Sequence, residues 1–203
     1  MAYSSQVSGP VPGDDISVYV NGTTLSFSDG HSYTFIKKPH LLAEALRLKE
    51  EIPRGADPTQ FPIFNNWLAK VGDKEMEAIC RKQMYENEQF QERLWQRNYA
   101  YGMGMNSYLA WQADSNGVSK LITKEGLPGT EWEEKNEKKL TEHERATTVE
   151  ALIGAVEMDS RNEVETMEVM RRLGVWWPCT EKEEELIWAH LQQMRDLGVI
   201  PRR

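Results

Sequence analysis

The chain has 203 residues and a net charge of −8 at neutral pH. That length suffices for one well-filled core, so one domain is expected. The acidic balance disfavours general binding to phosphate backbones, and DNA is not an expected partner. The only cysteines are Cys80 and Cys179. They do not form a disulfide framework, and they favour a reducing compartment, either cytoplasmic or nuclear.

No targeting signal is expected at the N-terminus. Residues 1–15 are small, polar and rich in Pro and Gly, which predicts a flexible arm and not a secretory leader. No apolar run approaches the length of a membrane span, so no membrane partner is expected.

A small β ribbon is predicted for residues 16–35. ISVYV (16–20) and TTLSF (23–27) flank Asn21-Gly22, a dipeptide typical of tight hairpin turns. A second turn at 28–30 leads into HSYTF (31–35). We expect this ribbon to pack on a helical body.

The sequence pattern in the middle of the chain predicts helices. A first helix begins near Pro39 and runs through LLAEALRLKEE, and its apolar stripe is Leu41, Leu42, Ala45 and Leu46. Three prolines make residues 52–62 a loop. A long helix follows from about Ile63 to Glu86. Residues 88–113 form an aromatic-rich helical region that the glycines at 102–105 interrupt.

The C-terminal part is also helical. Residues 115–129 predict a loop with a short helical piece, and the charged run 130–145 is compatible with a helix that leads into 146–159. A helix over 162–177 has Gly174 as its C-cap, with Val164, Met167, Val169, Met170 and Leu173 on its apolar side. The last helix spans 180–198, with Thr180 as N-cap. Nothing alternates as βαβ units do, so the expected architecture is all-α with a small N-terminal β-hairpin.

The most informative stretch is TTVEALIGAVEMD, residues 147–159. Its apolar positions Val149, Leu152, Ile153 and Val156 make one face of a helix. Gly154 costs such a helix about 1 kcal/mol relative to Ala. A glycine there indicates that another helix packs closely against it, and Gly72 indicates the same for the helix at 63–86.

Few reaction types remain open on the residues alone. The four histidines (His31, His40, His143, His190) are too scattered for a zinc site, and no Gly-x-Ser-x-Gly nucleophile motif exists. The glycines at 102–105 follow no strand and lack the lysine of a phosphate-binding loop. Asp73 and Glu150 lie on two helices with close-packing glycines, an arrangement that suits Mg²⁺. The alternative is that both acids simply flank the core.

Four segments together resemble the ribonuclease III domain. YTFIKKPHLLAEALR (33–47) resembles its opening, and NNWLAKVGDKEMEAI (65–79) its signature helix, usually N-E-R-L-E-F-L-G-D. NSYLAWQADSNGVSKLI (106–122) resembles its middle helix, and TTVEALIGAVEMD resembles its last catalytic helix, D-x-x-E-A-L-I-G-A. The order and spacing agree over about residues 33–175.

The resemblance implies an all-α endonuclease fold that works as a homodimer. In the family, four acidic residues gather around Mg²⁺, and activated water cleaves double-stranded RNA. Asp73 and Glu150 match two of these acids, whereas the other two fall on Ala69 and Thr147. A further glutamate of the signature helix falls on Asn66. By the same resemblance, Phe64 and Trp67 are candidates for the dimer contact.

Losing two carboxylates removes two negative charges from the metal cage, so family-type cleavage should be strongly reduced or absent. The chain is therefore expected to be a pseudoenzyme, a homodimer acting in RNA binding, RNA processing or assembly. The alternative is an enzyme that uses the residual cleft of Asp73, Asn66, Thr147, Glu150 and His143. It would be either a weak endonuclease on double-stranded RNA, with Mg²⁺ or Mn²⁺ held by Asp73 and Glu150, or a fold reused for a small molecule.

The expected domain covers residues 16–178, and residues 179–203 add a C-terminal helix packed on it. The family usually has a helix where this chain predicts its β ribbon. Residues 16–32 are thus a departure, and we interpret them as an interaction surface particular to this protein.

Overall fold

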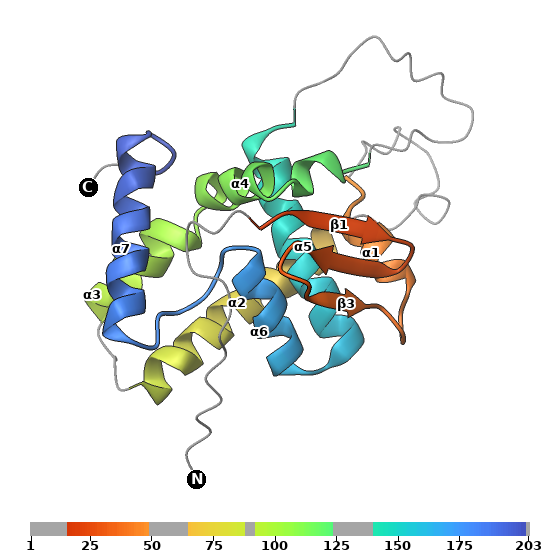
Figure 1. Cartoon of the computed structure of the whole chain (residues 1–203), viewed down its shortest axis with the longest axis horizontal. Coiled ribbons are helices and arrows are strands. Elements are labelled where there is room, and N and C mark those ends of the chain that lie inside the picture. Colours follow the sequence, from red (N-terminus) through yellow and green to blue (C-terminus); the bar gives the residue numbers. More distant parts are fainter. Residues whose placement is uncertain (1–15, 49–64, 88–91, 124–139, 202–203) are drawn as a thin grey trace, which may run out of the picture.

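The computed structural model of the chain describes residues 16–48, 65–87, 92–123 and 140–201. This part is mostly helical, with a small three-stranded antiparallel sheet near the N-terminus (Figure 1). The strands are β1 (Val18–Asn21), β2 (Thr24–Phe27) and β3 (Ser32–Thr34). The helices are α1 (His40–Ala45), α2 (Asn66–Glu86), α3 (Glu92–Trp95), η2 (Gln96–Met103), α4 (Asn106–Ser115), η3 (Val118–Lys120), α5 (Glu142–Ser160), α6 (Glu163–Arg172) and α7 (Glu181–Asp196).

The predicted hairpin is confirmed. β1 pairs antiparallel with β2, and Asn21 faces Thr24 across the turn. Gly22 has a φ of 60°, which a glycine adopts at little cost. Side chains alternate along the strands, so that Leu25 and Tyr33, which are paired across β2 and β3, both lie in the core. The ribbon therefore packs on the helical body through one face.

The first helix is shorter than predicted. α1 ends at Ala45, although the apolar stripe predicts a helix to about residue 51. Beyond it, Arg47 forms a parallel bridge with Thr123, and the Leu48 amide donates to the Thr123 carbonyl at 3.2 Å. The Asn65 amide donates to the Arg47 carbonyl, also at 3.2 Å. Pairing with distant segments ends this helix, and local pattern does not reveal such pairing.

The predicted interruption at 102–105 is confirmed. η2 is a π-helix with non-helical backbone angles at Tyr101 and Gly102, and α4 begins after Met105. The long helix before it, α2, begins at Asn66; Ile63 and Phe64 lie outside the described residues.

α5 begins at a capping box and not within a longer charged helix. The Thr141 side chain accepts from the Glu144 amide at 3.1 Å, and the Glu144 carboxylate accepts from the Thr141 amide at 2.7 Å. Residues 142–145 of the predicted charged run form the first turn of α5, whereas Leu140 and Thr141 are not helical; residues 130–139 lie outside the described part. This reciprocal cap defines the start of the helix.

The predicted end of the helix over 162–177 is wrong, since α6 ends at Arg172, but the turn at Gly174 and the cap at Thr180 are confirmed. α6 stops before Gly174, which has a φ of 85°, and the Thr180 side chain caps α7 by accepting from the Glu183 amide. The predicted apolar side of α6 is wrong at Val164, which is 58% exposed, because the buried face of α6 is formed by Thr166, Val169 and Met170. Gly102 lies against Leu191, which places α7 beside η2.

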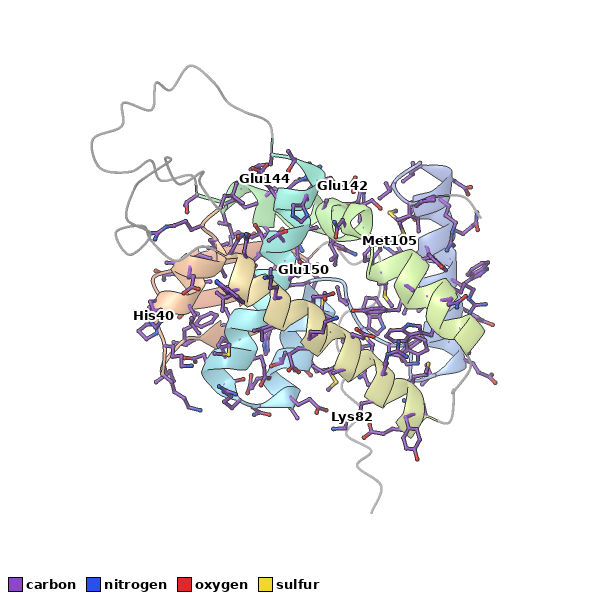
Figure 2. The ribbon with its side chains drawn as sticks, turned by 180° about the vertical axis from the view of Figure 1, so that it is seen from behind. His40, Lys82, Met105, Glu142, Glu144 and Glu150 are labelled. Carbon is purple, nitrogen blue, oxygen red and sulfur yellow. The ribbon has the colours of Figure 1, made fainter. Side chains whose placement is uncertain are left out.

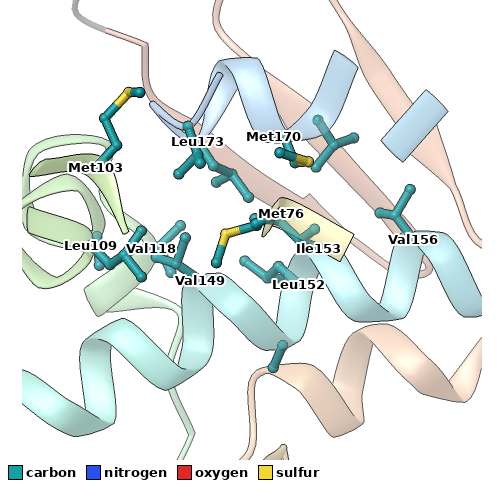
Figure 3. Packing of buried hydrophobic residues seen from close by; sticks show 14 of the residues in the cluster. Met76, Met103, Leu109, Val118, Val149, Leu152, Ile153, Val156, Met170 and Leu173 are labelled. Atoms are coloured by element: carbon teal, nitrogen blue, oxygen red, sulfur yellow. The ribbon is translucent and has the colours of Figure 1, made fainter. Parts of the chain in front are cut away.

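α5 is the centre of the core. Its residues from Ala146 to Val149 and from Ala151 to Val156 are all buried. Met76 of α2 and Met170 and Leu173 of α6 contribute to the same apolar cluster around it (Figure 3). A helix buried on nearly all sides needs little amphipathic pattern. No helix in the described residues is long and apolar enough to cross a membrane.

Candidate functional site

The site lies where α2 and α5 cross. A Cβ on Gly72 would collide with the Glu150 carbonyl and lie 3.0 Å from the Gly154 amide nitrogen. A Cβ on Gly154 would collide with the Leu68 carbonyl and lie 2.9 Å from the Gly72 amide nitrogen. The helices therefore touch through their backbones. The prediction that another helix packs against each glycine is confirmed.

This crossing brings Asp73 and Glu150 into electrostatic contact. Burial raises the pKa of Glu150, and the nearby Asp73 carboxylate raises it further, to about 7. Figure 2 shows Glu150 at the crossing, far from Glu142 and Glu144 at the start of α5. Glu150 forms no hydrogen bond or ion pair with another residue that the structure describes. Near neutral pH this carboxyl can therefore both hold and release a proton.

Asp73 is better solvated than Glu150. Its Oδ2 lies 3.2 Å from the Lys74 ammonium, and the Asp73 side chain is 50% exposed. An exposed pair of this kind contributes little stability. Asp73 therefore lies on the solvent side of the pair, while Glu150 lies deeper.

Glu77, one turn after Asp73, is engaged elsewhere. Its carboxylate accepts from Arg81 at 3.0 Å and from Lys74 at 3.4 Å. The hydrogen bond from Arg81 is the main reason why the pKa of Glu77 is lowered. Two cations already neutralise Glu77, so it is a poor replacement for a missing metal ligand.

Tyr99 adds a polar group that the sequence did not indicate. Its ring is 7% exposed and stacks on Trp95, and its hydroxyl has no hydrogen-bond partner among the described residues. Burial raises its pKa, and Cys80, Asp73, Glu77 and Glu150 raise it further. These acids are therefore near enough to Tyr99 to act on the pKa of its hydroxyl. No spacing rule could have found it, because the irregular turn of η2 and the close fit of Gly104 against its ring place it there.

The two positions that the resemblance aligns with further acids are both buried. Ala69 is 5% exposed and Thr147 is 7% exposed. The neighbouring Thr148 donates to the Glu144 carbonyl at 2.9 Å and accepts from Asn65 at 3.4 Å. The N-terminal ends of α2 and α5 are thus joined by neutral side chains, which contribute no charge to a cation site.

Two other predicted cleft residues, Asn66 and His143, lie about two helical turns before Asp73 and Glu150, respectively. Asn66 is exposed, and the buried asparagine of this turn is its neighbour Asn65. His143 is also exposed, and its Nδ1 lies 3.5 Å from the Asn106 side chain of α4. The structure therefore brings together Asp73 and Glu150, keeps Thr147 one turn before Glu150, and does not bring His143 to them.

The Asp73 and Glu150 carboxylates supply only part of the ligand set that a hard cation such as Mg²⁺ needs. The described residues contain no group of three His, Cys, Asp or Glu side chains placed to hold a metal ion. Asp73 and Glu150 carry two of the oxygen ligands that Mg²⁺ prefers, and water would have to supply most of the others. The raised pKa of Glu150 has the sign expected where two carboxylates approach without a cation between them. Any cation here would be held weakly.

No family model, curated protein or solved structure matches the chain. Function is therefore argued from the site itself.

Proposed function

We propose that the chain is a ribonuclease III-like protein with a degenerate catalytic centre, acting as a non-cleaving homodimer in RNA binding, RNA processing or assembly. One observation carries the proposal. The backbone contact at Gly72 and Gly154 holds Asp73 beside Glu150, while the two positions that match the remaining acids are buried Ala69 and Thr147.

The side chains at the α2–α5 crossing support weak metal binding, but they supply few of the other groups that RNA cleavage needs. Asp73 and Glu150 are the groups that would hold Mg²⁺ or Mn²⁺, whose chemistry here is to activate water and stabilise the charge on a phosphate. Glu150 would have to lose its proton before it could bind a cation. Ala69 offers no oxygen, and Thr147 only a neutral hydroxyl.

The experiment restores the missing charge. Wild-type protein and the Ala69→Glu/Thr147→Asp variant are incubated with long duplex RNA and Mg²⁺ or Mn²⁺. We expect no cleavage by wild-type protein and measurable cleavage by the restored variant, lost again when Asp73→Asn is added. Ala78→Glu, at an exposed position on the same helix, is the matched control and should not cleave. A restored variant that folds and binds duplex RNA without cleaving it would contradict the proposal.

A second candidate function is an enzyme that uses the residual cleft. The pKa of about 7 at Glu150 favours it, because such a group can transfer protons at neutral pH, and the Tyr99 hydroxyl lies near the same acids. Mn²⁺-dependent cleavage by wild-type protein, abolished by Glu150→Gln, would support the nuclease form. If wild-type protein neither cleaves RNA nor binds it at low salt, the functions that remain are assembly or small-molecule chemistry.

A further inference from the structure

The chain contains two Asn-Gly dipeptides, and the structure places them in opposite surroundings. Asn21 ends β1 and Gly22 opens the turn to β2; both are exposed, and this turn lies at an outer edge of the molecule (Figure 1). Asn116-Gly117 follows α4, and Asn116 is only 4% exposed. A glycine has no side chain to shield its amide nitrogen, so an asparagine carboxamide before it is open to attack by that nitrogen. The two dipeptides therefore place the same reactive groups in two different environments.

The reactive groups of Asn21 and Gly22 are free to meet. Neither the Asn21 side chain nor the Gly22 amide forms a hydrogen bond with another residue that the structure describes. A Cβ on Gly22 would meet nothing within 4 Å, so no neighbouring atom restricts this stretch of backbone. The carboxamide carbon of Asn21 and the amide nitrogen of Gly22 also belong to the same short stretch of chain, so their reaction needs no encounter between molecules.

The same groups are engaged at Asn116 and Gly117. The Asn116 Oδ1 accepts from the Val118 amide at 3.1 Å, and the Gly117 amide donates to the Asp114 carbonyl at 3.3 Å. The Asn116 carbonyl also accepts from the Val18 amide of β1 at 2.8 Å. Attack by the Gly117 nitrogen would have to break these hydrogen bonds and rotate a backbone that β1 holds. The fold therefore protects this second dipeptide.

We propose that Asn21 is a site of spontaneous covalent modification, at which the Gly22 amide nitrogen displaces ammonia from the Asn21 carboxamide. A bond forms between that nitrogen and the Asn21 Cγ, and the bond from Cγ to the carboxamide nitrogen breaks. The carboxamide nitrogen leaves as ammonia, together with the proton of the Gly22 amide. Water then opens the resulting succinimide ring at either carbonyl, which leaves aspartate or isoaspartate.

Either product changes the exposed tip of the β ribbon. Both add one negative charge there, and isoaspartate also adds one methylene group to the main chain between β1 and the turn. Asn21 faces Thr24 in the present register, and a longer main chain at this position does not fit that register. Nothing in this reaction uses the Asp73–Glu150 pair, so it can be tested independently of the proposed function.

Peptide mapping by mass spectrometry tests the proposal on the full chain, incubated for weeks at body temperature in mildly alkaline buffer. We expect aspartate and isoaspartate to accumulate at Asn21 at least about tenfold faster than at Asn116. The reaction should accelerate as the pH rises, since the attacking nitrogen reacts without its proton. In guanidinium chloride the two rates should come within about threefold of each other, because the fold no longer separates the two dipeptides.

Gly22→Ala is the variant that tests the attacking group. It should slow the modification of Asn21 by about tenfold, because a methyl group shields the nitrogen, and it should leave Asn116 unchanged. The φ of 60° at this position strains an alanine, so if circular dichroism shows that the variant is unfolded, the comparison of Asn21 with Asn116 in wild-type protein decides alone. Three results would each overturn the proposal: equal rates at the two asparagines in folded wild-type protein, aspartate without isoaspartate at position 21, or an unchanged rate in a folded Gly22→Ala variant.

Discussion

Two glutamates near the α2–α5 crossing show how neighbours decide the chemistry of identical side chains. The pKa of Glu77 is lowered, chiefly by the hydrogen bond from Arg81. The pKa of Glu150 is raised to about 7, first by burial and then by Asp73. Of these two glutamates, only Glu150 has a pKa near neutral pH.

Glu150 should make the protein less stable as the pH rises. Its folded-state pKa of about 7 exceeds its ordinary value of 4.5, so the folded state retains a proton that the unfolded state releases between these values. The free energy of unfolding falls as the pH rises through that window. Glu150→Gln removes this dependence, and we expect the variant to be more stable than wild type at pH 8 by on the order of 2 kcal/mol. Urea unfolding at several pH values measures it.

Glu86→Gln is the control for that series. Glu86 is an exposed glutamate at the end of α2, so its replacement should leave the pH dependence of stability unchanged. If Glu150→Gln kept the full wild-type slope between pH 5 and 7, some other group would be responsible for it, and Glu150 would not be a buried acid beside Asp73.

At the scale of elements, Asp159 joins the end of α5 to the segment between β3 and α1. Its carboxylate accepts from the Tyr33 hydroxyl at 2.8 Å, from the Ile36 amide at 3.2 Å and from the Lys38 amide. Asp159 is 3% exposed, so these bonds are made away from water. This side chain therefore contributes to holding the end of the N-terminal sheet on the helical body.

Asp159→Asn should destabilise the protein by about 2–3 kcal/mol, since an amide cannot accept from three donors as a carboxylate does. Tyr33→Phe, which removes only one of the bonds, should cost about 1 kcal/mol. Chemical denaturation measures both, with Glu185→Gln, at an exposed acid of α7, as control. Equal, small losses for Asp159→Asn and Glu185→Gln would mean that the network does not hold the sheet in place.

The crossing of α2 and α5 depends on the absence of two side chains. Alanine normally stabilises a helix relative to glycine by about 1 kcal/mol. At Gly154 the sign should reverse, because a Cβ would collide with the Leu68 carbonyl, which belongs to a backbone that cannot turn aside. We expect Gly154→Ala to cost about 3 kcal/mol or more, measured by thermal unfolding. Gly198→Ala, where a Cβ meets nothing within 4 Å, is the steric control, although its positive φ carries a smaller cost. A stabilised Gly154→Ala variant would mean that the helices lie farther apart.

At the scale of the whole molecule, local signals predicted most of the elements. Asn21-Gly22, Gly174 and Thr180 each act within a few residues, and each is at the turn or helix end that it predicts. The capping box of Thr141 and Glu144 is equally local, and it marks the start of α5 better than the charge run before it. Elements set by such short-range contacts can be read directly from sequence.

The features of the structure that the sequence could not predict depend on contacts between distant segments. α1 ends early because Arg47 pairs with Thr123, and Tyr99 reaches the acidic site only through the irregular turn of η2. The closeness of Asp73 and Glu150 was predictable from their glycines, but the exposure of Asn66 and His143 was not. The helical repeat shows which residues share a face, and only tertiary packing determines which face is covered.

The last prediction concerns homodimer assembly and rests on the exposed side chain of Trp67. It is 69% exposed on α2, the helix that bears Asp73, and the Lys70 ammonium lies 4.3 Å from the centre of its ring. Large exposed aromatic side chains are common anchors of protein interfaces. If the proposed homodimer forms through this face, Trp67→Glu should weaken its association by at least about tenfold, as measured by sedimentation velocity. Tyr85→Glu is the matched control, since Tyr85 is 72% exposed at the other end of the same helix. A monomeric wild-type protein at micromolar concentration would contradict the homodimer, and an undisturbed dimer in the Trp67→Glu variant would assign its interface to another face.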